Sequence, residues 1–83
     1  MTPEQLDQEL ERVFTSVFGL PPGGFNRELS METLAEWDSI AHVMLVLGLE
    51  SALGVHFGPD EAATLTTVVS IREKLLARGV GDG

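Results

Sequence analysis

The sequence contains no cysteine, few basic residues and no long run of apolar residues. The absence of cysteine excludes a disulfide framework, a thiolate metal site and a cysteine nucleophile of the chain's own. Any thiol chemistry must therefore be imported on an attached group or by a partner. The longest unbroken apolar run, Val43 to Leu47, is far shorter than the roughly 18 residues that a membrane span needs, so we expect no span.

Basic residues are outnumbered by acidic ones. Five Lys and Arg against 13 Asp and Glu give a formal net charge of −8 at pH 7. This charge repels phosphate backbones and anionic membrane surfaces, so we expect neither nucleic acid nor membrane as a partner. It favours partner proteins that carry basic patches. The first residues also lack the basic region and apolar core of a secretory signal, and we expect a cytoplasmic location.

The residues that are present predict one small helical domain. The chain has 83 residues, of which 43% are hydrophobic, and this is enough for one modest core. Apolar residues recur at helical spacing between capping residues and glycines, and no segment has the alternation of a strand. We expect an all-α fold, a three- to four-helix bundle with a long first loop, formed by residues 1–83 as a single domain. The expected helices cover about 3–18, 39–53, 59–64 and 67–78, and residues 80–83 are expected to fray.

The helix expected at 39–53 is apolar on two opposite faces. At about 100° per residue, one face carries Leu45, Val46, Leu49 and Leu53, and the other carries Ile40, Val43, Met44 and Leu47. In so short a chain only one face needs to pack against a core. We therefore predict that the first face is buried and that the second is an exposed docking face. Gly48 lies between the faces at a cost of about 1 kcal/mol relative to alanine, which predicts a close approach of another backbone.

Residues that could carry catalysis or bind a metal are sparse. The histidines, His42 and His56, do not form a helical pair of metal ligands, and the acids do not follow the pattern of a calcium loop. His42 is expected to be partly buried with one hydrogen bond. No nucleophile and base are paired in the sequence. We expect no metal site and no catalytic activity of the chain's own.

Ser39 stands at the start of the double-faced helix, directly after Asp38. By position alone it is a capping or first-turn residue. The same position can stabilise a phosphate, because the N–H groups of the first turn are free and the helix dipole favours negative charge. Position is thus compatible with a phosphoester without establishing one.

The segment Trp37-Asp38-Ser39-Ile40 resembles the Asp-Ser-Leu attachment motif of the acyl and peptidyl carrier proteins. Most of the chain is similar to this family in the order of its further features, which are the long glycine- and proline-containing first loop, the helix that begins at Ser39, Gly54-Val55-His56-Phe57, Pro59-Asp60-Glu61 and Thr66-Thr67-Val68.

The resemblance implies that a separate phosphopantetheinyl transferase esterifies Ser39 with 4′-phosphopantetheine from coenzyme A. Acyl groups would then be held on this arm as thioesters and presented to other enzymes. Asp38 would help to position the motif for the transferase. The partner face would consist of Ile40, Val43, Met44 and Leu47.

Two departures from the family narrow the expected role. Carriers of primary fatty acid synthesis resemble one another in a strongly acidic second helix, whereas the helix expected here at 39–53 contains Glu50 as its only acid. Peptidyl carriers usually share a glycine-rich approach to the serine, which Glu36-Trp37-Asp38 does not provide. The resemblance therefore favours a discrete, monomeric carrier of polyketide, hybrid or other specialised biosynthesis. Its partners would be loading and processing enzymes of the ligase, ketosynthase, condensation or transferase type.

Two alternatives stay open for the chain as a whole. It could be a carrier in fatty acid synthesis, or a non-catalytic acidic interaction module that docks through the exposed face and does not need Ser39. The inner face of the same helix also has two interpretations. It could be ordinary core, or it could open to shelter an acyl chain.

Overall fold

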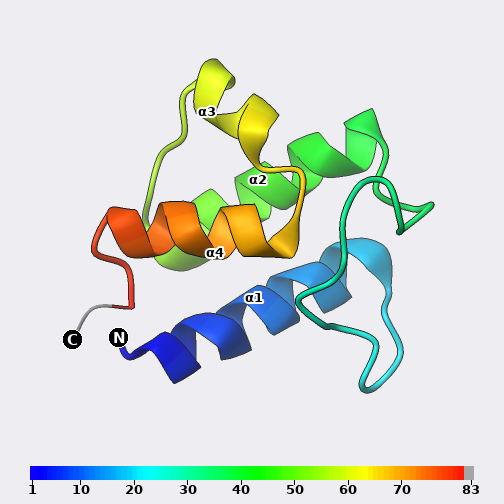
Figure 1. Cartoon of the computed structure of the whole chain (residues 1–83), viewed down its shortest axis with the longest axis horizontal. Helices are drawn as coiled ribbons and strands as arrows, with labels where there is room; N and C mark the ends of the chain where they lie inside the picture. Colours follow the sequence, from blue (N-terminus) through cyan, green and yellow to red (C-terminus); the bar gives the residue numbers. More distant parts are fainter. Residues whose placement is uncertain (82–83) are drawn as a thin grey trace.

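The computed structural model describes residues 1–81 and consists of four helices joined by loops (Figure 1). The helices are α1 (Pro3–Phe18), α2 (Ser39–Leu53), α3 (Pro59–Thr64) and α4 (Val68–Ala77). Over the described residues no strand forms, and β pairing is limited to an isolated bridge between Ser30 and Thr67. The expected all-α bundle is confirmed. α4 is one residue shorter at each end than expected.

The helix ends are set by local side-chain and backbone chemistry. The Thr2 hydroxyl accepts the Gln5 N–H at 3.2 Å, and the Gln5 side chain accepts the Thr2 N–H at 2.8 Å. Thr67 caps α4 in the same reciprocal way with the residue three positions further on. Gly19 and Gly54, with φ of 63° and 66°, end α1 and α2 in the left-handed conformation that glycine adopts without strain.

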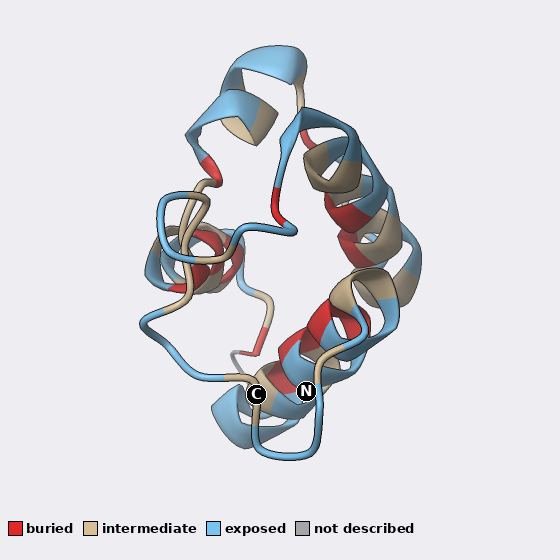
Figure 2. Ribbon diagram, turned by 90° about the vertical axis from the view of Figure 1, so that its right-hand side faces the viewer, coloured by how far each residue is buried: buried red, intermediate tan, exposed pale blue. Residues whose placement is uncertain are grey.

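The core is formed by α1, α2, α4 and residues of the loops. Figure 2 shows that the buried parts of these helices face the interior. The buried side chains are Leu6, Leu10, Val13, Phe14, Trp37, Leu45, Leu49, Phe57, Leu65, Val68, Ile71 and Leu75. Full burial of one such leucine or phenylalanine side chain stabilises the fold by about 1.5–3 kcal/mol. The predicted inner face of α2 is buried at Leu45 and Leu49, while Val46 and Leu53 are partly buried against the same core.

The long connection between α1 and α2 packs against the bundle. Phe25 and Leu29 are partly buried on the core. Trp37 is only 2% exposed, and its ring meets that of Phe14 edge-on at 5.3 Å between centroids. The Val68 N–H donates to the Leu29 carbonyl at 3.0 Å, which joins this connection to the start of α4. The connection therefore has a defined position, and its last residues lead directly into α2.

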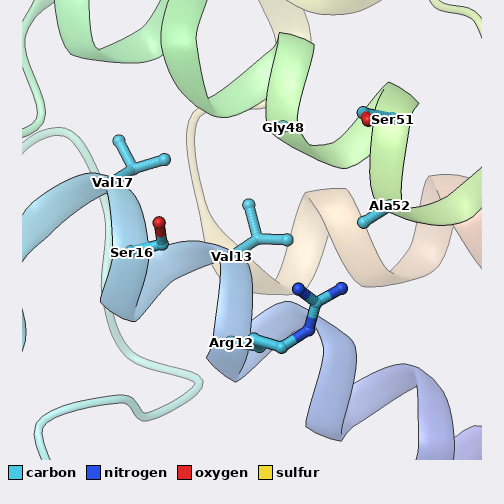
Figure 3. A pocket seen from close by; sticks show the side chains of 7 residues that line it. All are labelled: Arg12, Val13, Ser16, Val17, Gly48, Ser51 and Ala52. Atoms are coloured by element: carbon cyan, nitrogen blue, oxygen red, sulfur yellow. The ribbon is translucent and has the colours of Figure 1, made fainter.

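Gly48 lies where α1 and α2 meet (Figure 3). A Cβ on Gly48 would be 3.1 Å from Cγ1 of Val13. The close neighbour is thus a side chain, and the prediction of a neighbouring backbone is wrong. A branched side chain on α1 fills the space that glycine leaves, so the helices are joined by apolar packing at this point.

The prediction that residues 80–83 fray is wrong for the first two of them. Val80 packs against the core, and its N–H donates to the Leu75 carbonyl at 3.0 Å. Gly81 is buried beside Leu6 of α1. Apolar contact with α1 therefore holds the chain beyond the end of α4. The last two positions of the prediction lie outside the described residues.

Candidate functional site

Ser39 is the first residue of α2, and it is exposed. Asp38 is the N-cap: its backbone is extended, and its Oδ1 accepts the Ala41 N–H at 2.8 Å. The first intrahelical bond follows, from the His42 N–H to the Asp38 carbonyl at 2.8 Å. Ser39 is therefore a first-turn residue rather than the cap. A carboxylate cap of this kind stabilises a helix by about 1 kcal/mol.

Capping by Asp38 leaves two backbone donors at this helix end. The first N–H groups of an α-helix have no partner within the helix. Of these, the Ala41 N–H is taken by Asp38, whereas the N–H groups of Ser39 and Ile40 precede the first intrahelical bond. They lie at the positive end of the helix dipole, which favours an anion at this position by about 0.3–1 kcal/mol. The arrangement suits a negatively charged group on the Ser39 side chain.

An apolar face, defined by Ile40, Val43, Met44 and Leu47, follows Ser39 along α2. These side chains are 76%, 59%, 56% and 58% exposed, in that order. The predicted exposure is confirmed, and the role as a docking face stays a prediction. The face covers two turns of helix, or roughly 10 Å along the axis. Large apolar side chains gathered in this way are typical of a surface that meets a partner.

The charged side chains near Ser39 do not belong to the apolar face of α2. Each of the five basic residues lies in an ion pair with an acid of α1 or α3; the pairs are Arg12–Glu9, Arg27–Asp7, Arg72–Asp7, Lys74–Glu61 and Arg78–Glu61. The carboxylates nearest to Ser39 in sequence, Glu36 and Asp38, are exposed and belong to none of these pairs. The N-terminal end of α2 is therefore acidic, while α2 itself has no acid or base before Glu50 apart from His42.

Behind Ser39, a histidine joins three parts of the chain. The Trp37 indole N–H donates to Nδ1 of His42 at 2.9 Å, and the two rings lie nearly parallel, with an interplanar angle of 23°. Nε2 of His42 lies 2.8 Å from the carbonyl oxygen of Ala62 in α3. Because the indole can only donate, Nδ1 must accept, so Nε2 carries the proton and donates to Ala62. His42 therefore makes two hydrogen bonds, and the prediction of one is wrong. Sequence reasoning missed both partners, because neither lies at a helical spacing from His42.

A hollow lies between α1 and α2, away from Ser39 (Figure 3). It has a volume of about 460 Å³ and is lined by Arg12, Val13, Ser16, Val17, Gly48, Ser51 and Ala52. Its α2 residues follow Ser39 by nine or more positions, which is at least roughly 13 Å along the helix. Its lining pairs no nucleophile with a base. The hollow is therefore not part of the surface around Ser39.

Two further properties concern the whole of residues 1–81. No three His, Asp or Glu side chains converge there as a metal site requires. In the same residues, every helix is too short or too polar to cross a membrane. The expected partner enzymes are tested by neither observation.

No protein-family model matches this chain. No curated protein is significantly similar to it. The site is therefore interpreted from its own residues. What distinguishes it is an exposed serine on the first turn of α2, an aspartate cap directly before that serine, and an exposed apolar face directly after it.

Proposed function

We propose that this protein is an acyl carrier whose Ser39 bears a 4′-phosphopantetheine arm. The observation that carries the proposal is the position of Ser39, exposed between the Asp38 cap and the apolar face of α2. Its sequence context, Trp37-Asp38-Ser39-Ile40, resembles the attachment motif of carrier proteins. The absence of cysteine adds a chemical reason, because a chain that holds thioesters must obtain its thiol from an attached group.

The attachment is a transfer of phosphopantetheine from coenzyme A. The Ser39 hydroxyl oxygen attacks the phosphorus of coenzyme A that bears the pantetheine, and the bond to the adenosine bisphosphate breaks. A phosphodiester forms on Ser39, adenosine 3′,5′-bisphosphate leaves, and a base of the transferase takes the hydroxyl proton. The N–H groups at the start of α2 then face a negatively charged phosphodiester, which the helix dipole favours.

Once the arm is attached, its terminal thiol holds acyl groups as thioesters. The chain itself performs no chemistry on them. Ile40, Val43, Met44 and Leu47 contact the partner enzymes, which load, extend or transfer the acyl group. Because this face is uncharged, its contacts depend less on salt than the net charge of −8 suggests. A cytoplasmic carrier of specialised biosynthesis, polyketide or hybrid in type, fits this combination best.

An interaction module without a prosthetic group is the second candidate. The observation that favours it is the exposed apolar face, which can dock a helix or groove of a partner whether or not Ser39 is modified. The two functions differ at Ser39. The carrier requires its hydroxyl, and the module does not.

The experiment that tests the proposal is an intact-mass measurement. The purified protein is incubated with coenzyme A, magnesium and a broad-specificity phosphopantetheinyl transferase. The carrier gains the mass of one phosphopantetheine, and Ser39→Ala gains none. Ser51→Ala is the matched control, because Ser51 is also an exposed serine of α2 and its loss must leave the gain intact. No gain in a wild-type protein with normal helical circular dichroism favours the interaction module.

A further inference from the structure

The bridge through His42 connects the residue before the helix cap to α3. Trp37 directly precedes Asp38, and the bond from its indole to Nδ1 of His42 closes across the turn that carries Ser39. The other ring nitrogen binds the carbonyl of Ala62, twenty residues further along the chain. The His42 imidazole thus contacts both the residues that lead into α2 and the backbone of α3.

α3 is anchored at its end by apolar packing and elsewhere by polar links. None of its six residues is fully buried, but Ala62 packs partly against the core, and Leu65, its C-cap residue, is 0% exposed. Its polar links run to α4 through Glu61, which bonds Arg78, and to α2 through Ala62, which bonds His42. The bond to His42 is therefore a direct polar link between α3 and α2.

Trp37 is held firmly by comparison. It is 2% exposed, and its ring contacts those of Phe14 and Phe18 at 5.3 Å and 5.7 Å between centroids. The indole N–H is the polar atom of this buried side chain, and a buried donor without an acceptor costs about 1–3 kcal/mol. His42 supplies the acceptor. Without it, Trp37 must shift toward water, and Asp38 and Ser39 follow directly in the chain.

We propose that His42 is a positioning residue that fixes the orientation of Ser39 for modification by accepting the indole N–H of Trp37. This inference rests on the proposed function, since it concerns the reaction at the same serine. His42 touches neither coenzyme A nor the reacting atoms. It acts through Trp37, which sets the start of α2, while its second hydrogen bond, to Ala62 of α3, holds the imidazole in place. The apolar face that docks the transferase stays intact when the bridge is broken.

Two conservative substitutions separate the two hydrogen bonds. In His42→Asn the side-chain oxygen can take the place of Nδ1 and accept from Trp37, but the side chain is too short to reach Ala62. In His42→Gln the amide nitrogen can take the place of Nε2 and donate to Ala62, while the acceptor near Trp37 is lost. Both variants keep a neutral polar side chain at position 42 of α2. Each loses one hydrogen bond of the bridge.

The kinetics of modification by the transferase then distinguish a positioning role of His42 from an effect on the stability of the fold. We expect kcat for modification of His42→Gln to fall about fivefold, the factor that one hydrogen bond supplies, with KM unchanged because docking is unaffected. His42→Asn should retain the wild-type kcat within about twofold. Equal kcat values for the two variants, at similar free energies of unfolding, would overturn the proposal.

A second readout does not depend on modification. Trp37 is the only tryptophan, so its indole N–H gives one resonance in a ¹H–¹⁵N spectrum. Its exchange with water should be as slow in His42→Asn as in the wild type and much faster in His42→Gln. Should His42→Gln not fold, Trp37→Phe removes the same bond while keeping an aromatic ring, and it must show the same loss of kcat.

The two readouts keep this inference separate from the proposed function. An unmodified wild-type protein with a protected indole N–H contradicts the carrier and, with it, the role of His42 in the reaction. A modified wild-type protein whose indole N–H exchanges equally fast in all variants contradicts the bridge alone.

Discussion

Cγ1 of Val13 lies 3.1 Å from the position that a Cβ would take on Gly48, so α1 and α2 meet here as closely as a side chain on α1 permits. Glycine in a helix interior costs about 1 kcal/mol relative to alanine. The close packing of Val13 offsets this cost. The contact explains why a residue that weakens α2 by itself occupies the middle of that helix.

Substitutions at Gly48 should therefore depend on size. Gly48→Val overpacks the contact with Val13 and should lower the free energy of unfolding by about 1–3 kcal/mol. Gly48→Ala should change it by no more than about 1 kcal/mol, because the gain in helix propensity compensates for the tight contact. Urea unfolding followed by circular dichroism measures both. A Gly48→Val protein as stable as the wild type would show that the helices are further apart.

A matched pair of leucines tests the two faces of α2. Leu49 is fully buried, and Leu47 is 58% exposed. Leu49→Ala should lower the free energy of unfolding by about 2–5 kcal/mol, and Leu47→Ala should change it by less than about 0.5 kcal/mol. The measurement is urea unfolding of both variants under one set of conditions. Similar losses would mean that the outer face packs within the protein, which would contradict its proposed role in docking.

Two substitutions of Asp38 separate the contribution of its capping hydrogen bond from that of its negative charge. Asp38→Ala removes the acceptor of the Ala41 N–H and should lower the free energy of unfolding by about 1 kcal/mol. Asp38→Asn keeps a side-chain oxygen at the same place and should stay within a few tenths of a kcal/mol of the wild type. Thermal unfolding monitored at 222 nm compares the three proteins. A loss in Asp38→Asn equal to that in Asp38→Ala would assign the stabilisation to the negative charge at the helix dipole.

The link between α3 and α4 should depend on pH. A hydrogen bond from Arg78 is the main reason why the pKa of Glu61 is lowered, followed by the Gly58 N–H and the nearby charges of Arg78 and Lys74, while desolvation opposes them. Because the pKa is lower in the folded state, Glu61 contributes stability above the ordinary carboxyl pKa. This stability is lost as the pH falls through the lowered value.

The corresponding variant is Glu61→Gln, which cannot ionise. Wild type should be more stable than Glu61→Gln at neutral pH, and the difference should shrink as the solution becomes more acidic than the ordinary carboxyl pKa. Urea midpoints of both proteins over a series of pH values give this difference. A difference that is constant with pH would mean that Arg78 holds the side chain without regard to its charge.

The predictable parts of the fold were those that depend on neighbouring residues. The capping box at Thr2, the cap at Thr67 and the glycine ends of two helices are local, and the helix bounds follow from them. The two faces of α2 follow from helical periodicity. The exposure of its outer face could be predicted because a chain of 83 residues has only one core to offer.

The contacts between distant segments could not be predicted in the same way. Nothing near His42 in the sequence indicates that Ala62 faces it, because that contact depends on where α3 lies in space. The neighbour of Gly48 was mistaken for a backbone, since the space left by a missing Cβ does not reveal which atom fills it. The docking of Val80 on the core likewise depends on the path of the chain after α4.

The most direct test of the carrier is a count of free thiols. The chain has no cysteine, so the unmodified protein must react with no thiol reagent. After incubation with coenzyme A and a phosphopantetheinyl transferase, and removal of small molecules, the account predicts one thiol per chain on the wild type and none on Ser39→Ala. A folded wild-type protein that carries no thiol after incubation with a transferase of demonstrated activity would contradict the account.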